Sequence, residues 1–210
     1  MKDDMSGAAC ILGVMSKLKE FSPNIEVHGI IAACENMIGP NAYKPGDILR
    51  AKNGKTIEID NTDAEGRVTL ADALCYACEL NVDEVIDIAT LTGACMVALG
   101  THASGIMGNN KDLVNRLIQV GAKSGERYWE MPMFEEYFDS MKSEIADMKN
   151  TGSRWGGTSA AGLFLQNFVT DNVKWAHLDV AGTAFIEKPQ KEFIAGATGV
   201  GVRTLLNYII

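Results

Sequence analysis

The sequence predicts an α/β fold in three layers, with a central, largely parallel (mixed) sheet flanked by helices. Helix-like and strand-like segments alternate along its 210 residues, and two strand-like segments, 25–34 and 84–90, are apolar on both faces. Strands buried on both faces are typical of sheets that helices cover on each side. No repeat, low-complexity tract or linker interrupts the chain, so we expect one domain over residues 1–210.

Each expected element follows from a local pattern. Apolar residues at helical spacing predict a helix at 6–21, which ends before Ser22-Pro23. The dipeptide Asn53-Gly54 predicts a hairpin turn. Alternation of apolar and polar residues predicts a further strand at 174–180. The remaining expected elements are helices at 69–80, 111–123, 134–142, 159–169 and 202–210.

Charge and cysteine usage exclude several classes of protein. A formal charge of -8 without any basic cluster disfavours binding to nucleic acid or to anionic membranes. The longest apolar run, 85–100, contains Asp87 and Gly93 and is too short to cross a bilayer. No secretory signal is recognisable, and the five cysteines are an odd number in apolar surroundings, so we expect buried, reduced thiols and a cytoplasmic protein.

Asp63 and Glu65 form the strongest candidate for a chemical site. In an extended segment two carboxylates at this spacing point to the same side, and Gly66 would let the chain turn immediately afterwards. A helix beginning near Thr69 would direct its positive end at this region and favour an anion close to Arg67. Together with the early acids Asp3 and Asp4, the pair could form an oxygen-rich metal site, although such pairs alone are commonly structural.

The segment from Asn61 to Arg67, Asn-Thr-Asp-Ala-Glu-Gly-Arg, resembles the signature of the leucine aminopeptidase (cytosol aminopeptidase) family. The likeness extends over essentially the whole chain, in the segments 1–9, 32–37, 45–47, 70–74, 87–93, 150–157 and 175–182. The resemblance implies that the chain is the C-terminal catalytic domain of such an enzyme. Enzymes of this family use two metal ions to remove the N-terminal residue of peptides, and the resemblance implies a preference for leucine-like residues.

The resemblance also implies a role for individual residues. Asp4, Asp63 and Glu65 are expected as metal ligands, with Glu65 bridging two divalent ions. The ions are zinc or manganese, with magnesium or cobalt as alternatives. Arg67 is expected to be catalytic and to be associated with a bicarbonate that acts as general base. The expected substrate contacts are Met1, Thr90, Leu91, Gly93, Ala181 and Ala184.

Further expectations concern the whole enzyme. The family forms hexamers, and its upstream segment supplies two lysines and a bridging aspartate that this sequence does not contain. We therefore expect a catalytic domain truncated at its N-terminal side, and one alternative is a non-catalytic fragment or assembly module of the same family.

A distant alternative is a serine hydrolase that uses Ser159, in the imperfect elbow 157–161, with His177 as the base. The three histidines lack the paired spacing of a zinc site, so we interpret His28, His102 and His177 as structural. Asp179, close to His177 on a predicted strand, is interpreted in the same way.

Overall fold

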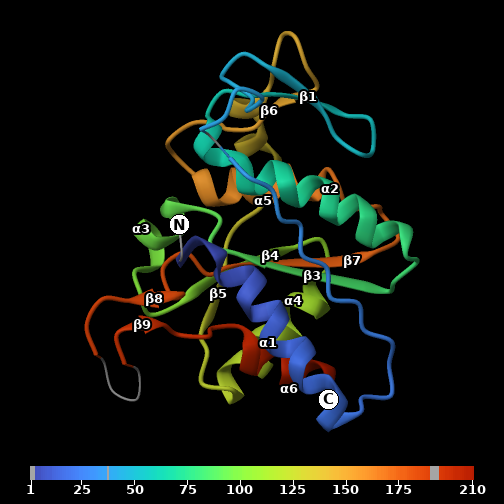
Figure 1. The fold of residues 1–210 in the computed structure, drawn as a ribbon, viewed down its shortest axis with the longest axis vertical. Helices are drawn as coiled ribbons and strands as arrows, with labels where there is room; N and C mark the ends of the chain where they lie inside the picture. Colours follow the sequence, from blue (N-terminus) through green and yellow to red (C-terminus); the bar gives the residue numbers. More distant parts are fainter. Residues whose placement is uncertain (1–2, 37, 190–193) are drawn as a thin grey trace. The chain divides into compact units, whose positions relative to one another are not determined.

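The computed structural model describes residues 3–36, 38–189 and 194–210, which form mixed sheets flanked by helices and so confirm the α/β class (Figure 1). The residues group into two compact units, each built from separate stretches of chain. Unit 1 comprises Met1–Ile31, Ile86–Met131 and Trp175–Ile210, and unit 2 comprises Ala32–Val85 and Pro132–Lys174. That residues 1–210 act as one catalytic domain stays a prediction.

Unit 1 is organised around a four-stranded sheet with the order β3-β7-β4-β5. Strand β4 is parallel to β5 and antiparallel to β7, so the sheet is mixed, as predicted. Its strands are β3 (Glu84–Ala89), β7 (Lys174–Asp179), β4 (Ser104–Gly108) and β5 (Tyr128–Glu130). Strands β3 and β7 match the predicted segments, whereas the short strands β4 and β5 were not predicted.

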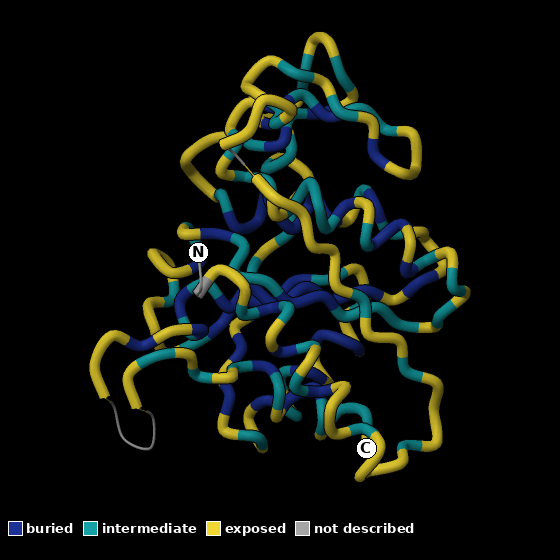
Figure 2. Tube along the Cα trace, viewed as in Figure 1, coloured by how far each residue is buried: buried dark blue, intermediate teal, exposed yellow. Residues whose placement is uncertain are grey.

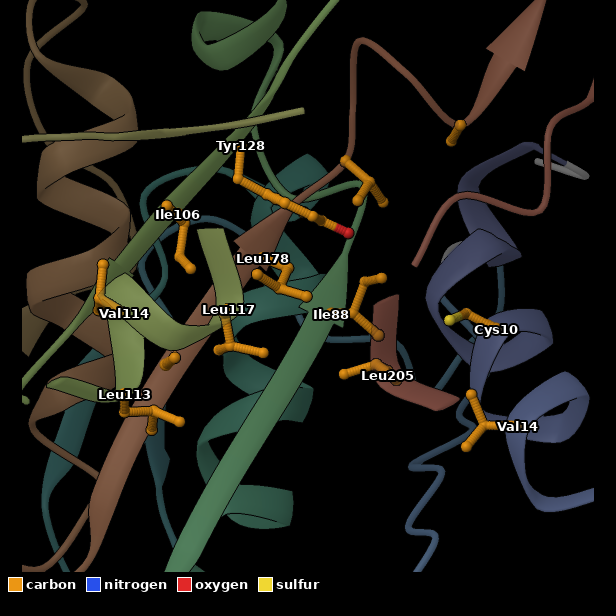
Figure 3. Close-up of a cluster of buried hydrophobic side chains, with 13 residues drawn as sticks. Cys10, Val14, Ile88, Ile106, Leu113, Val114, Leu117, Tyr128, Leu178 and Leu205 are labelled. Atoms are coloured by element: carbon orange, nitrogen blue, oxygen red, sulfur yellow. The ribbon is translucent and has the colours of Figure 1, made fainter. Parts of the chain in front are cut away.

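The core of unit 1 lies between this sheet and the helices α1, α4 and α6, as Figure 3 shows. Helix α1 buries Gly7, Cys10 and Val14, which recur at helical spacing. A Cβ atom at Gly7 would collide with the carbonyl oxygen of Ile88, so only glycine allows α1 to approach β3 this closely. The helical elements are η1 (Asp3–Met5), α1 (Ser6–Phe21), α3 (Gly93–Leu99), α4 (Lys111–Lys123) and α6 (Val202–Ile209); a ribbon of β8 (Phe185–Ile186) and β9 (Gly196–Ala197) completes the unit.

Unit 2 combines a small sheet with two longer helices. The hairpin around Asn53-Gly54 is confirmed: β1 pairs antiparallel with β2, and Gly54 has a φ of 90°. Strand β6 adds to β2 in parallel. The rings of Phe164 and Phe168 lie 5.1 Å apart in the core of the unit. The elements are β1 (Ile48–Arg50), β2 (Thr56–Glu58), η2 (Thr62–Ala64), α2 (Glu65–Glu79), η3 (Glu135–Met141), β6 (Met148–Lys149) and α5 (Gly157–Gln166).

Several sequence predictions were wrong in detail. Residues 25–34 form no strand, and Figure 2 shows the segment after α1 as mostly exposed. A β-rich run becomes a strand only when a neighbour accepts its backbone hydrogen bonds, and no described strand pairs with this run. The helix predicted at 134–142 is the 3-10 helix η3, and α3 was not predicted. All five thiols are free, but Cys34 is exposed and Cys78 only half-buried, so the prediction of buried thiols holds for the other three.

None of the described helices combines the length and the apolar character needed to cross a membrane.

Candidate functional site

In unit 2 the acidic motif is helical, which corrects the extended conformation predicted for it. The side chain of Asn61 accepts a hydrogen bond from the amide of Asp63 and thereby starts the 3-10 turn η2. Helix α2 then begins at Glu65, four residues before the predicted start near Thr69. Two side chains two positions apart point in different directions in a helix, so local geometry alone does not bring the carboxylates together.

The early start of α2 places Glu65 at the positive end of a 15-residue helix, where a carboxylate is stabilised. The Oε2 atom of Glu65 is buried, whereas Asp63 is exposed. Burial, and then the nearby charge of Glu65, raise the pKa of the Tyr43 hydroxyl. Arg67 lies in the same first turn of α2, so its cationic side chain starts beside the acidic motif.

Asn150 holds the backbone that leads into the motif. It is fully buried, and its Oδ1 atom accepts hydrogen bonds from the amides of Asp60 at 2.8 Å and Asn61 at 3.3 Å. Its Nδ2 atom donates to the carbonyl oxygens of Asn61 at 2.6 Å and Ala64 at 3.4 Å. The neighbouring Thr151 hydroxyl donates to the Asp60 carboxylate at 2.7 Å. One amide side chain therefore fixes the turn that carries Asp63.

In unit 1 the structure joins two predicted site residues directly. The hydroxyl of Thr90 donates to the Asp4 carboxylate oxygen Oδ1 at 2.8 Å and lies 3.1 Å from the backbone oxygen of the same residue. Asp4 lies in the 3-10 turn before α1, and Thr90 follows β3 directly. A hydroxyl that holds one carboxylate oxygen orients the other, as hydrogen bonds around metal-binding carboxylates commonly do.

The segment Thr90–Gly93 leads from β3 into α3 and contains three predicted substrate contacts. The Thr92 hydroxyl accepts a hydrogen bond from the Cys95 amide and so caps α3. The same hydroxyl donates to the buried Asp179 carboxylate at 2.7 Å. Gly93 is exposed, whereas Leu91 and Thr90 are half-buried. This segment can therefore offer backbone groups to a ligand while its side chains anchor it.

The predicted pocket residues differ in their exposure. Ala181 follows β7 and is half-buried, with its amide donating to Asp179 at 3.2 Å. Ala184 is 2% exposed and packs in the hydrophobic core of unit 1, so only a small part of its surface could meet a substrate. Met1 lies outside the described residues.

Comparison with known proteins decides the family. The model of the cytosol aminopeptidase family, catalytic domain, matches residues 1–206. The chain belongs to this family. It is 53% identical over 210 residues to a probable cytosol aminopeptidase of Gloeobacter violaceus and 51% identical over 211 residues to one of Aquifex aeolicus. In both comparisons all of the chain is aligned, against 42% and 43% of the relative.

A solved structure of a tomato leucine aminopeptidase mutant is also similar to this cytosol aminopeptidase domain. Its TM-score is 0.95 and its sequence identity 52%, with all of this chain covered and 41% of that chain. The chain thus spans about two fifths of the length of the relatives that it matches. It corresponds to the C-terminal, catalytic part of the family proteins.

The metal-ligand roles expected for this family stay predictions. Asp4 belongs to unit 1, whereas Asp63 and Glu65 belong to unit 2. Within the described ranges, no group of three or more His, Cys, Asp or Glu side chains is arranged to hold a metal ion by itself. The donor chemistry nevertheless fits, because carboxylate oxygens are ligands that zinc, manganese and magnesium all accept, and the Asp4 carboxylate is already oriented by Thr90.

The serine-hydrolase alternative is not supported by the fold. Ser159 lies inside α5 and is 3% exposed, whereas a nucleophile elbow needs an exposed serine on a sharp turn after a strand. His177 is fully buried, and its Nδ1 atom lies 2.5 Å from Asp87, whose other oxygen accepts a hydrogen bond from the Trp175 indole. This agrees with a structural role for His177.

Sequence reasoning missed two anchors in this aminopeptidase domain. Asn150 was noticed only as part of a family-like segment, and Asp179 only as a structural acid. Their contacts join residues about 90 positions apart in the chain, so no local pattern identifies them. A polar residue just after or at the end of a strand was the one available signal, because sites in α/β proteins gather at strand ends.

Proposed function

We propose that this chain is the catalytic part of a metal-dependent aminopeptidase that hydrolyses the N-terminal residue from peptides, with a leucine-like preference. Its membership of the cytosol aminopeptidase family over residues 1–206 is the observation that carries the proposal. Two further features support it. The acidic motif lies at the start of a long helix, and two predicted site residues, Asp4 and Thr90, are hydrogen-bonded to each other.

Asp4, Asp63 and Glu65 would hold two divalent ions, with Glu65 shared between them. When bound, such ions polarise the scissile carbonyl and lower the pKa of a water so that it can attack at neutral pH. The chain itself supplies anionic oxygens in defined orientations. Thr90 holds one oxygen of Asp4, and Glu65 lies at the positive end of α2.

Arg67 would bind the anion that takes the proton. A guanidinium stays charged at neutral pH and has only donors, so Arg67 cannot itself act as a base. In the first turn of α2 it adds its charge to the positive end of the helix. Its positive charge would hold a bicarbonate in place, and that bicarbonate would accept a proton from the attacking water.

The segment Thr90–Gly93 would bind the substrate backbone. It follows β3, and its exposed Gly93 leaves space for a peptide to approach the main chain. Ala181 and Ala184, with Met1, would border the side chain of the N-terminal residue. The small side chain of Ala181, which is half-buried, leaves volume for a large apolar group such as leucine, whereas Ala184 would contribute only the small part of its surface that is exposed.

The assembly and location of the protein belong to the same proposal. The curated relatives are named cytosol aminopeptidases, which supports a cytosolic protein. We propose a hexamer in the intact enzyme and peptides as its substrates, with zinc or manganese as the resident metals.

The test uses the purified chain with zinc or manganese added. Bound metal is measured by mass spectrometry and activity with leucine p-nitroanilide, with and without a chelator. Glu65→Ala is expected to lose metal and all measurable activity, because it removes a shared ligand. Arg67→Ala is expected to keep the metal and to slow turnover by about a hundredfold or more.

Glu79→Ala is the matched control, since Glu79 ends the same helix and pairs with Lys52 at the surface. It should change neither metal content nor turnover. Equal metal loss in the Glu65 and Arg67 variants would contradict the separate roles. A chain that binds no metal and hydrolyses nothing would instead favour the non-catalytic assembly module.

A further inference from the structure

Asp179, the last residue of β7, is fully buried and gathers four hydrogen-bond donors from two loops. Its Oδ1 atom accepts from the amides of Leu91 at 3.2 Å, Thr92 at 3.4 Å and Ala181 at 3.2 Å. Its Oδ2 atom accepts from the Thr92 hydroxyl at 2.7 Å. Donors from the loop after β3 and from the loop after β7 thus meet on one carboxylate.

The charge of this carboxylate is compensated by these donors. A buried carboxylate is tolerated only when hydrogen bonds or a cation replace its hydration. The contacts of Asp179 in the described residues are with N–H and O–H groups rather than with a lysine or arginine. Removing the carboxylate would leave several buried donors unsatisfied at once, and the two loops would lose their common acceptor.

Neighbouring hydrogen bonds join the same two loops and helix α3. The amide of Val180 donates to the carbonyl oxygen of Ala89 at 2.9 Å, so both loops leave the sheet side by side. The Thr92 hydroxyl, which donates to Asp179, also caps α3. Burial and the charge of Asp179 raise the pKa of the Cys95 thiol to about 12, so this neighbour stays neutral.

We propose that Asp179 is a positioning residue that fixes the segment Thr90–Gly93 and the turn at Ala181 in one arrangement for binding the N-terminal end of a substrate. This inference rests on the proposed function, which assigns substrate contacts to both segments. Asp179 itself touches neither the substrate nor the metals. It acts by holding the main chain of the residues that do.

The experiment compares two substitutions at Asp179 with the same two at Asp87. Asp179→Ala removes the acceptor, whereas Asp179→Asn keeps a side-chain oxygen that can still accept. Asp87 is the matched control, because it is also a buried aspartate of this sheet but bonds Trp175 and His177 rather than the loops. Amide hydrogen exchange is followed by NMR in the full 210-residue chain, and KM and kcat are measured with leucine p-nitroanilide after metal loading.

In Asp179→Ala we expect the amides of Leu91, Thr92 and Ala181 to exchange at least about tenfold faster than in the wild type. KM should rise about tenfold or more, with a smaller change in kcat, because the loops bind substrate but carry no reacting group. Asp179→Asn should restore much of both quantities. The Asp87 variants should lower stability without changing KM or the three amides selectively.

Equal exchange at these amides in the Asp179 and Asp87 variants would overturn the inference. So would a fall in kcat with unchanged KM in Asp179→Ala. If the metal-loaded wild-type chain hydrolyses nothing, the proposed function fails for this chain, whereas the amide exchange still decides whether Asp179 holds the two segments.

Discussion

In unit 1 two loops turn round the carboxylate of Asp179, whereas in unit 2 the approach to the acidic motif turns round the amide of Asn150. Both side chains are fully buried, and each makes four hydrogen bonds to the segments it holds. Asp179 only accepts. Asn150 accepts from two amides and donates to two carbonyl oxygens.

The two side chains differ because the backbone groups that they bind differ. The loop after β3, which leads into α3, and the turn after β7 both direct N–H groups at Asp179, and a carboxylate can satisfy them. The turn before η2 presents both N–H and C=O groups, which only a side chain with both functions can satisfy. Aspartate and asparagine have nearly the same shape, so exchanging them tests this chemistry with little change in volume.

The largest effect is expected for Asn150→Asp. A carboxylate there would face the carbonyl oxygens of Asn61 and Ala64 and lose both donations, at a cost of about 3 kcal/mol or more in the free energy of unfolding. Asp179→Asn keeps its acceptor and should cost about 1 kcal/mol. Urea unfolding followed by circular dichroism measures both.

Asn167→Asp provides the control in unit 2. Its side chain also donates to a carbonyl oxygen, that of Leu163. Its Oδ1 atom, however, accepts from the Lys55 ammonium, which would form an ion pair with a carboxylate at this position. We expect a change within about 1 kcal/mol. If Asp179→Asn proved as costly as Asn150→Asp, the contrast between the two anchors would be wrong.

A second prediction concerns how tightly the backbone packs. Gly7→Ala in unit 1 should lower the free energy of unfolding by about 2 kcal/mol, because the new methyl group meets the rigid carbonyl of Ile88. Gly39→Ala in unit 2 is the control, since nothing lies within 4 Å of the added atom. Thermal melts of both variants measure the difference. A Gly7 variant as stable as the Gly39 variant would mean that α1 can move away from β3 without loss.

The sequence predicted the elements whose own residues carry the pattern. Helix α1 and the hairpin at Gly54 appear where expected, because helical spacing and turn chemistry act over a few residues. Strand β4 was missed, since its sequence Ser-Gly-Ile-Met-Gly is short and glycine-rich and depends on β5 and β7 for its pairing. Residues 25–34 show the converse, a β-rich pattern without a described partner.

In the candidate site, too, local patterns could be predicted from the sequence, whereas long-range contacts could not. The sequence proposes Asp63, Glu65 and Arg67 as site residues because they form one short motif. Their helical conformation was not predicted, since the hydrogen bond from the Asp63 amide to Asn61 starts a helical turn there. The contact between Asp4 and Thr90 spans 86 positions and could be anticipated only through the family resemblance. The holding roles of Asn150 and Asp179 depend on contacts of the same long range, which the three-dimensional structure alone reveals.

The smallest effect is expected for an exposed carboxylate that otherwise resembles Asp179. Asp147 accepts from the amide of Thr56 at 2.7 Å and from its hydroxyl at 2.8 Å, and these bonds, the amide first, lower the pKa of Asp147 from its ordinary value of 3.8. A lowered pKa in the folded state means that the unfolded chain takes up the proton first as pH falls. The stabilising contribution of the Asp147 carboxylate is therefore complete above pH 3.8, and it is lost as the pH falls through the lower pKa that Asp147 has in the folded state.

Urea midpoints of the wild type and of Asp147→Asn, measured from pH 7 down to pH 2, test this contribution. The difference between the two proteins should be small at neutral pH, because water competes for an exposed carboxylate, and it should shrink further below pH 4. Thr56→Val removes the hydroxyl but keeps the amide, so it should weaken the pH dependence without abolishing it. A midpoint difference that grew on acidification would reverse the sign and show that hydrogen bonding does not favour the ionised form at this exposed position.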